Sequence, residues 1–353
     1  MRGEIRMREQ LLQWREEELA DRLGQWKLPA FRVRQIYRQS RNYVELADMT
    51  DLPKQLREEL GQSCCVRCAG IYRKYVSADG TVKYLLELAD GNLIECVLMR
   101  QSYGNTLCVS TQAGCRMGCK FCASGQGGLI RNLTAAEIFS EVLAVNADQG
   151  GTAEKRQITN LVLMGCGEPL DNYGEVIRFL RLVNESGGIN ISYRNISLST
   201  CGLVPRIDDL AKEGIDLTLA ISLHAAFDEK RRQIMPVANS YTVRQVIAAA
   251  KRYFESTHRR FIVEYSLIGG FNTLEEDADA LRELLRGCAC HINLIPLNEV
   301  EGSQLKGCTK EECRRFLAML TERNLSATVR RRTGADVSGS CGQLRRRTLE
   351  EGR

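Results

Sequence analysis

Residues 106–122 read TLCVSTQAGCRMGCKFC, a short apolar strand that runs straight into a loop with three cysteines. The loop cysteines are Cys115, Cys119 and Cys122, so the gaps between them hold three and then two residues. Glycine and basic residues fill these gaps, which makes the loop a poor core segment. Thiols set this close together inside a cell bind metal or do chemistry more often than they form structural disulfides.

The composition is that of an ordinary globular protein. The chain has 353 residues, of which 44% are hydrophobic, and this length predicts two domains or one larger domain with an appendage. The sequence has no apolar run near the roughly 20 residues of a membrane span. Residues 1–10 lack the apolar segment of a signal peptide. We therefore expect a cytoplasmic protein with reduced thiols and no membrane partner.

The positive charge is modest in amount but uneven in distribution. The formal net charge is +5, and arginines occupy positions 330–332 and again 345–347. Clusters of this kind bind phosphates, as a nucleic-acid partner would require. A solvated charged face is the alternative interpretation.

Three regions with different patterns follow one another along the chain. Residues 1–62 have apolar positions at helical spacing, which predicts amphipathic helices over 8–26, 31–49 and 52–61. Residues 63–103 alternate and carry Asp-Gly pairs at 79–80 and 90–91, which predicts a small β-meander that links the two larger regions. Residues 104–353 contain repeated strand–helix units and end in the basic segment.

The third region predicts an α/β fold built on a parallel sheet. Six units suit a partial (β/α)6 barrel of the TIM-like type, with an open sheet as the alternative. The predicted strands are 106–111, 158–164, 194–200, 216–222, 260–268 and 291–297. Four helices should begin with a capping box, at Thr134 with Glu137, Thr242 with Gln245, Thr273 with Glu276, and Thr309 with Glu312.

Polar and glycine residues follow these strands at their C-terminal ends, where the active sites of such folds lie. One such segment by itself is a weak signal, because glycines are common at strand–helix turns. The set predicts one site that collects side chains from every strand. Its segments are the cysteine loop, 165–169, 199–202, 222–224, 269–272 and Asn298.

The cysteine spacing suits an iron–sulfur cluster. Three thiolates can hold three irons of a [4Fe–4S] cluster, which leaves the fourth iron open for a ligand such as S-adenosylmethionine (SAM). The Cys-x3-Cys-x2-Cys pattern, with Phe121 before its last cysteine, resembles the signature of the radical SAM superfamily. A zinc site is the main alternative, although it usually takes four ligands and only Cys108 is near in sequence. Buried inert cysteines are a second alternative.

A more specific resemblance covers nearly the whole chain. LCVSTQAGCRMGCKFC, MGCGEPLDN, ISLST, AISLHA, INLIPLN and CGQL are similar to the RlmN/Cfr family of radical SAM RNA methyltransferases, as are FRVRQIY and MTDLPKQLR near the N-terminus. The resemblance implies a radical SAM barrel with an N-terminal helical accessory domain that binds RNA. It implies methylation of adenosine C2 in 23S rRNA and in certain tRNAs, at the adenosine next to the anticodon.

Two alternatives to C2 methylation stay open. The C8-methylating, Cfr-type branch of the same family gives antibiotic resistance and shares the same machinery. A non-catalytic iron–sulfur or zinc protein that binds RNA belongs to a different class. For that class Cys64, Cys65 and Cys68, or Cys288 and Cys290 beside His291, are candidate zinc ligands, although neither set is a complete four-ligand pattern.

The resemblance also implies roles for individual cysteines. The cysteines of the loop would hold the cluster, and two SAM molecules would be used in each turnover. One SAM methylates Cys341, and a radical from the second takes a hydrogen from that methyl group, whose carbon then joins the RNA. Cys108 resolves this covalent intermediate by forming a disulfide with Cys341. Glu95 matches the proposed proton acceptor, whereas by pattern alone it would be a solvent-facing residue of an alternating strand.

The remaining implied residues bind SAM. Glu168 is suited to meet the ammonium of its methionyl group, and capping of the following helix is the alternative role. His224 would by default be a structural histidine. The implied partners are 23S rRNA, tRNA and an electron donor such as flavodoxin or ferredoxin, and the protein would be a monomer. The SAM residues are Gly167, Glu168, Ser199, Ser222, Leu223, His224 and Asn298.

Overall fold

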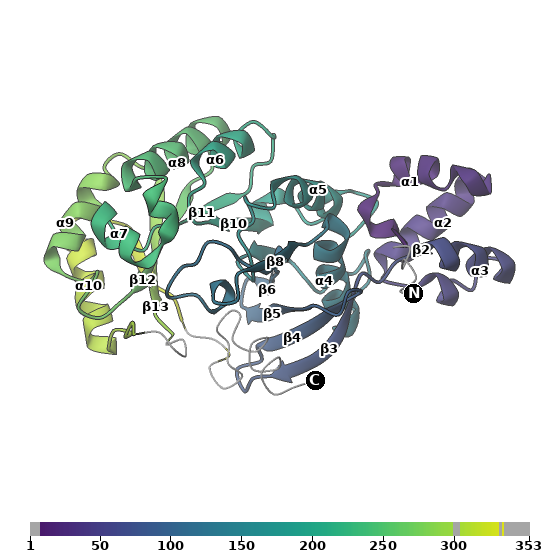
Figure 1. Ribbon diagram of the computed structural model, residues 1–353, viewed down its shortest axis with the longest axis horizontal. Coiled ribbons are helices and arrows are strands. Elements are labelled where there is room, and N and C mark those ends of the chain that lie inside the picture. Colours follow the sequence, from purple (N-terminus) through teal and green to yellow (C-terminus); the bar gives the residue numbers. More distant parts are fainter. Residues whose placement is uncertain (1–7, 299–303, 332–333, 335–353) are drawn as a thin grey trace, which may run out of the picture.

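The computed structural model describes residues 8–298, 304–331 and 334. These residues form a helical part at the N-terminus, an antiparallel β-meander and a curved parallel sheet lined with helices (Figure 1). The predicted α/β fold with a partial barrel is confirmed. Cys341 and the arginines at 332 and 345–347 lie outside the described residues.

The N-terminal part is helical, as predicted, but its first two helices are shorter than predicted. The stretch 8–26 is interrupted at Arg15, whose extended backbone donates its N–H to Glu18 Oε2 over 2.9 Å. In the stretch 31–49 the helix ends at Arg41, because Tyr43 has a left-handed φ of 60°. The elements are β1 (Glu9–Gln10), α1 (Glu16–Arg22), α2 (Ala30–Arg41), α3 (Lys54–Ser63) and β2 (Cys64–Cys65), with 3-10 turns at Leu11–Gln13, Gly24–Trp26 and Leu46–Asp48.

One sheet of ten strands runs through the described part of the chain, in the order β14-β13-β12-β11-β10-β9-β6-β5-β4-β3. In this order, neighbouring strands between β14 and β6 pair parallel, and neighbouring strands between β6 and β3 pair antiparallel. The strands are β3 (Ala69–Val76), β4 (Val82–Leu88), β5 (Leu93–Gln101), β6 (Gly104–Cys108), β9 (Asn160–Leu163), β10 (Ile196–Thr200), β11 (Thr218–Ser222), β12 (Phe261–Leu267), β13 (Cys290–Pro296) and β14 (Ala327–Val329).

The meander is part of the same sheet as the barrel. Its hairpin turns lie at the two predicted Asp-Gly pairs, and β5 pairs with β6 from Val97 opposite Cys108 to Gln101 opposite Gly104. All six predicted parallel strands are present. The seventh, β14, was not predicted, because its three residues Ala-Thr-Val give no usable alternation. The proposed domain boundaries at 62 and 103 stay a prediction.

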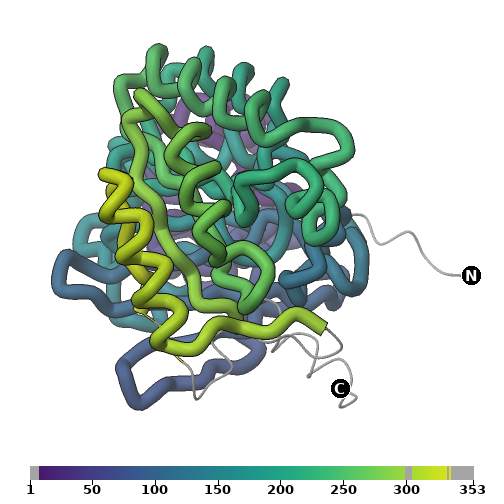
Figure 2. Tube along the Cα trace, turned by 90° about the vertical axis from the view of Figure 1, so that its left-hand side faces the viewer, coloured from purple at the N-terminus to yellow at the C-terminus, as the bar shows by residue number. Residues whose placement is uncertain are grey.

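Helices cover the outer face of the sheet (Figures 1 and 2). Capping boxes at Thr134, Thr242 and Thr309 are confirmed. The box predicted at Thr273 is wrong, because the helix begins one residue later and Asp277 accepts the N–H of Leu274 over 3.1 Å. The helices are α4 (Ala135–Asp148), α5 (Tyr173–Asn184), α6 (Val204–Leu210), α7 (Asp228–Ile234), α8 (Val243–Thr257), α9 (Glu275–Leu284) and α10 (Lys310–Glu322). Among the described helices, none has the length and apolarity to cross a bilayer.

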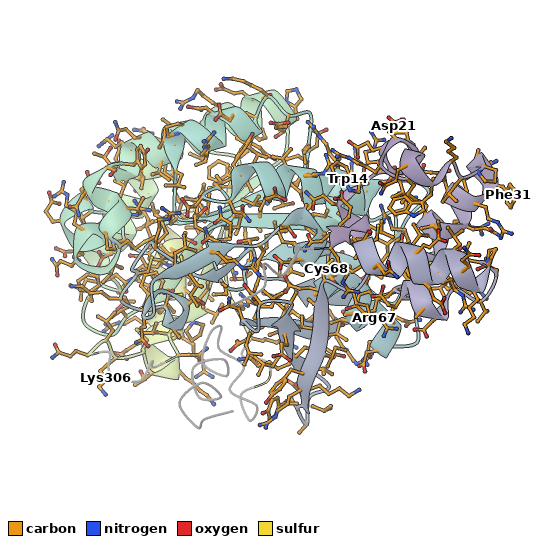
Figure 3. All side chains as sticks on the ribbon, turned by 45° about the vertical axis from the view of Figure 1, so that its right-hand side comes forward. Trp14, Asp21, Phe31, Arg67, Cys68 and Lys306 are labelled. Atoms are coloured by element: carbon orange, nitrogen blue, oxygen red, sulfur yellow. The ribbon has the colours of Figure 1, made fainter. Side chains whose placement is uncertain are left out.

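The helical part packs against α4 and α5. Arg41 is fully buried there, with its guanidinium carbon 4.2 Å from the ring centre of Tyr37 and 5.4 Å from that of Phe139. Arg178 of α5 donates to the carbonyl oxygen of Gln13 over 2.7 Å. Figure 3 shows Trp14 on the side of the helical part that meets the core, and Phe31 at its outer edge.

Candidate active site

The two faces of the parallel sheet differ in burial. Leu198, Leu219 and Val263 point towards the helices and are fully buried. The alternate side chains belong to the inner face, where Ser197 and Thr218 stand opposite each other and are only partly buried. Because side chains alternate along a strand, the inner face also receives Ser199, Ser222 and Glu264. It is the polar face on which a ligand can lie.

The cysteine loop leaves this sheet after β6 and is closed at its base by a small ribbon. Strands β7 (Gln112–Gly114) and β8 (Leu129–Asn132) pair antiparallel, and Cys115 donates its N–H to the carbonyl oxygen of Gly128 over 2.9 Å. Gly114 has a φ of 84°, and a Cβ there would lie 2.1 Å from the same oxygen. Only glycine therefore permits this closure.

Two contacts fix the far side of the loop to the barrel. The N–H of Lys120 donates to the carbonyl oxygen of Ile234, at the end of α7, over 2.9 Å. The ring of Phe121 meets the ring of His224 edge-on, with centroids 4.5 Å apart. The aromatic residue of the cysteine motif thus joins the loop to the end of β11.

The three loop thiols influence one another. Burial raises the pKa of Cys115 to about 12 and raises that of Cys119 further, and repulsion from neighbouring thiolates adds to both shifts. A cluster binds thiolates, so the charge of the iron has to offset this repulsion. Three thiols on one loop fit a four-iron cluster, in which each binds a separate iron and one iron stays open.

A single metal ion needs a different arrangement, with its thiolates about 2.3 Å from one point if it is zinc. Within the described residues, no three His, Cys, Asp or Glu side chains converge in that way. This finding covers the loop cysteines as well as Cys64, Cys65, Cys68, Cys288, Cys290 and His291.

Glu168 links two of the strand-end loops. Its Oε2 accepts the N–H of Cys201 over 2.8 Å, its Oε1 accepts that of Leu170 over 3.1 Å, and its own N–H donates to Gln112 Oε1 over 2.9 Å. Burial raises the pKa of the Glu168 carboxyl, and these hydrogen bonds act against that shift. Helix α5 begins five residues later, at Tyr173, so the alternative role as its cap is wrong.

Gly167 brings this loop against the start of the cysteine loop. Its φ is 110°, and a Cβ would lie 2.7 Å from Cβ of Gln112 and 2.8 Å from its backbone nitrogen. The backbone of the 165–169 segment therefore contacts β7, the short strand that leads into the cysteine loop.

Two serines near the C-terminal ends of β10 and β11 meet on the inner face. Ser199 Oγ lies 3.1 Å from Ser222 Oγ and donates to Glu264 Oε2 over 2.9 Å. Burial raises the pKa of Glu264, whereas the positive charge of Arg330 lowers it. A hydroxyl pair backed by a carboxyl group can donate to and accept from the ribose hydroxyls of a nucleoside ligand.

His224 is held in a rare conformation at the end of β11. Its φ is 57°, its Nδ1 accepts the N–H of Ser266 over 2.9 Å, and its carbonyl oxygen accepts from Asn272 over 2.8 Å. Burial and the positive charge of nearby Arg231 together lower its pKa to about 3. The imidazole is thus neutral near pH 7, and these contacts hold the end of β11 against β12 and the segment that follows it. Leu223 beside it is fully buried, and Asn298 is exposed.

Arg231 of α7 is a site residue that the sequence did not indicate. It is fully buried, and its guanidinium donates to the carbonyl oxygens of Cys201 over 2.6 Å, Leu223 over 3.1 Å and Ser222 over 3.2 Å. One cation therefore orders two strand-end loops. Nothing in the local sequence separates it from the exposed Arg232. Glu264 could have been found, as the one acidic residue in the predicted strand 260–268.

Glu95 and Cys108 share the inner face of the sheet. Val97 stands opposite Cys108 in the β5–β6 register, and Glu95 lies two residues before Val97, so both side chains point the same way. Glu95 is 4% exposed and forms an ion pair with fully buried Lys83. The solvent-facing alternative for Glu95 is therefore wrong. Cys108 packs with Val97, Met99, Val162 and Met164.

Known proteins resemble this chain along nearly its whole length. A model of the radical SAM superfamily matches residues 109–285. The chain is 48% identical over 334 residues to a probable dual-specificity RNA methyltransferase RlmN of Clostridium perfringens, covering 94% of each protein. It is 44% identical over 345 residues to a protein of the same name from Clostridium acetobutylicum, covering 97% of this chain and 99% of that one.

A solved structure agrees in fold. A radical SAM methyltransferase from Sphaerobacter thermophilus matches with a TM-score of 0.90 at 40% identity, covering 95% of this chain and 98% of the other. Membership of the superfamily implies a [4Fe–4S] cluster and SAM as cofactors. The chain belongs to the radical SAM superfamily and, within it, to the family of the dual-specificity RNA methyltransferases RlmN.

Proposed function

We propose that this protein methylates C2 of adenosine in 23S rRNA and in certain tRNAs, next to the anticodon. The observation that carries the proposal is the placement of Glu95 and Cys108 together on the inner face of the sheet. They lie on the neighbouring strands β5 and β6, and β6 leads into the cysteine loop. Binding SAM and a cluster requires neither a thiol nor a buried carboxylate at that place. The names of the relatives that share nearly the full length support RNA as the substrate.

The cofactor residues are those that the fold collects at the strand ends. Cys115, Cys119 and Cys122 would hold the cluster, and when reduced it supplies the electron that cleaves SAM to a 5′-deoxyadenosyl radical. Glu168 would accept from the methionyl ammonium. The other proposed SAM contacts are Gly167, Ser199, Ser222, Leu223, His224 and Asn298.

The remaining chemistry falls to side chains of the chain itself. Cys341, outside the described residues, would carry the methyl group and then bond through that carbon to the adenine. Glu95 would take the proton from the substituted adenine carbon. Cys108 Sγ would attack Cys341 Sγ, so that the S–S bond forms and the bond between the Cys341 sulfur and the methylene carbon breaks. The electron pair of that bond goes to the carbon, which takes up the proton given up by the Cys108 thiol, and the methylated base leaves. Two SAM molecules would be used in each turnover.

RNA would be bound by the helical part and by arginines such as Arg330 and Arg331, which are exposed. Contacts of this type are mainly to phosphates, so binding should weaken steeply with salt. The electron donor would be a flavodoxin or ferredoxin, and the protein would act as a cytoplasmic monomer. The C8-methylating branch is the second candidate, and the dual-specificity name of the relatives favours C2.

Replacing Cys108 tests the proposed covalent intermediate. Cys108→Ala should still consume SAM but should accumulate a covalent protein–RNA adduct, because no thiol is left to resolve it. Denaturing gel electrophoresis with labelled RNA measures the adduct. Cys96→Ala is the matched control, since Cys96 is also buried but lies on the neighbouring strand β5 and faces the opposite side of the sheet. Normal turnover by Cys108→Ala would contradict the resolving role.

A further inference from the structure

A lysine is completely buried inside the β-meander. Lys83 of β4 has no exposed surface, and its Nζ lies 3.0 Å from Glu95 Oε2 on β5, which is itself nearly buried. In the antiparallel register Lys83 stands opposite Val97, and Glu95 stands opposite Leu85. The two charged side chains are thus diagonal neighbours on the face that also carries Cys108.

Stability alone is a poor reason for this ion pair. Removing two charges from water costs more than most buried pairs return, and apolar residues of similar size often stabilise a protein more. The positions around the pair are already apolar, with Leu85 and Leu93 fully buried on the same face. An apolar residue at 83 would continue this packing, so the charge at this position calls for a functional reason.

The outer face of the same meander shows an ordinary alternative. Lys74 of β3 pairs with Asp148 of α4 over 2.7 Å, but its side chain is about half exposed. That lysine keeps about half of its contact with water. The burial of Lys83 is therefore not a general property of lysines in this meander.

We propose that Lys83 is a positioning residue, whose ammonium group holds the carboxylate of Glu95 directed towards the adenine carbon in the covalent intermediate. This inference rests on the proposed function. In the step concerned the C–H bond of the adduct breaks, its electron pair stays in the adenine ring, and an O–H bond forms on Glu95. Lys83 keeps its proton throughout and acts only through Glu95.

Other charged and titratable groups near the pair come from each neighbouring strand. On β3, Tyr75 stands opposite Lys83 and Arg73 stands opposite Leu85. On the β6 side lies Cys108, and Ser110 Oγ donates to the backbone oxygen of Glu95 over 2.7 Å. Arg330 contacts Met99, two strand positions beyond Val97, with a nitrogen–sulfur distance of 3.9 Å. Of these groups within the described residues, Lys83 is the one whose ion pair with the Glu95 carboxylate is seen, over 3.0 Å.

The test compares three variants of the full-length, cluster-loaded enzyme with SAM, reductant and unmodified rRNA. Lys83→Met removes the charge and keeps the length of the side chain. It should form 5′-deoxyadenosine within about twofold of the wild type, accumulate covalent protein–RNA adduct, and release methylated adenosine at least about 10-fold more slowly, as for loss of a positioned base. Lys83→Arg keeps the charge and should recover much of the release rate. Lys74→Met, the matched control, should behave as the wild type.

The outcomes separate the inference from the function beneath it. Wild-type release of product by Lys83→Met would overturn the inference alone. So would a Lys83→Met enzyme that loses SAM cleavage and methylation equally, since that is a purely structural effect. If Lys83→Met does not fold, Lys83→Gln keeps a hydrogen-bond donor without the charge, and it should show the same adduct. A wild-type enzyme that forms no methylated adenosine would instead contradict the proposed function.

Discussion

At the scale of single residues, the interior contains a carboxyl group whose pKa is strongly raised by burial. Glu141 lies in the middle of α4 and is fully buried. Its Oε2 accepts the N–H of Ser110 over 3.0 Å, while no partner for Oε1 is found among the described residues. Burial raises the pKa of Glu141 well above its ordinary value of 4.5. Burial therefore favours the protonated form of Glu141, which lies under the chain that leads into the cysteine loop.

This state predicts how stability depends on pH. A raised pKa in the folded protein gives stability that is fully present below about pH 4.5 and is lost as pH rises through the folded-state value. Glu141→Gln keeps an acceptor for Ser110 and cannot ionise. Relative to the wild type, the variant should gain up to about 1.4 kcal/mol of unfolding free energy per pH unit above pH 5. Urea midpoints from pH 5 to 8 measure this, and parallel curves for the two proteins would contradict it.

The sequence predicted which residues are candidates for the site, but it predicted less well how buried they are and which residues contact them. The cysteines of the loop and the strand-end residues followed from spacing and position. The burial of Glu95 could not be predicted in this way. Alternation along β5 shows which side chains share a face of the strand, but not which of the two faces is covered by other residues. The Asp-Gly pair at 90–91 fixes a hairpin, and its register would have placed Lys83 beside Glu95. Arg231 had no such signal.

At the scale of elements, the loops between strands and helices position the site, and Gly167 makes one of their close contacts. Gly167→Ala would place a methyl group 2.7 Å from Gln112 Cβ at a φ of 110°. We expect a loss of about 2–4 kcal/mol in unfolding free energy, from backbone strain and overpacking together. SAM binding should weaken too, because Glu168 moves with its neighbour. Thermal unfolding and equilibrium dialysis with SAM measure the two effects.

Gly174 provides the control for that substitution. It lies in the first turn of α5, and a Cβ there would meet no atom within 4 Å. Gly174→Ala should be neutral or stabilise the protein by up to about 1 kcal/mol. Equal behaviour of the two variants would show that the 165–169 loop is not held by close approach.

Element boundaries show where sequence patterns reach their limit. The six parallel strands were predicted because each is an apolar run followed by glycine or polar residues. Helix starts at Thr134, Thr242 and Thr309 were predicted by their capping boxes, but at Thr273 the tertiary pair of Lys230 with Asp277, at 2.8 Å, competes with the local pattern. Strand β14 is too short to show a period.

At the scale of the whole molecule, one continuous sheet joins the meander to the radical SAM barrel. The continuity explains why Glu95 and Cys108, which precede the cysteine motif in sequence, face the same interior as Ser199 and Glu264. Length and composition predicted separate regions but could not show that they share a sheet, because strand pairing between regions depends on tertiary contacts. The helical part is tied to the barrel through Arg41 and Arg178.

Analysis of the methylated nucleoside tests the central claim most directly. The cluster is reconstituted without oxygen, SAM, reductant and unmodified 23S rRNA are added, and the RNA is digested to nucleosides for mass spectrometry against both methyladenosine standards. We predict 2-methyladenosine, formed only when Cys115, Cys119 and Cys122 are intact. 8-Methyladenosine would contradict the C2 assignment and place the protein in the other branch. Neither product from rRNA or tRNA, with the cluster intact and SAM still cleaved, would contradict RNA adenosine as the substrate.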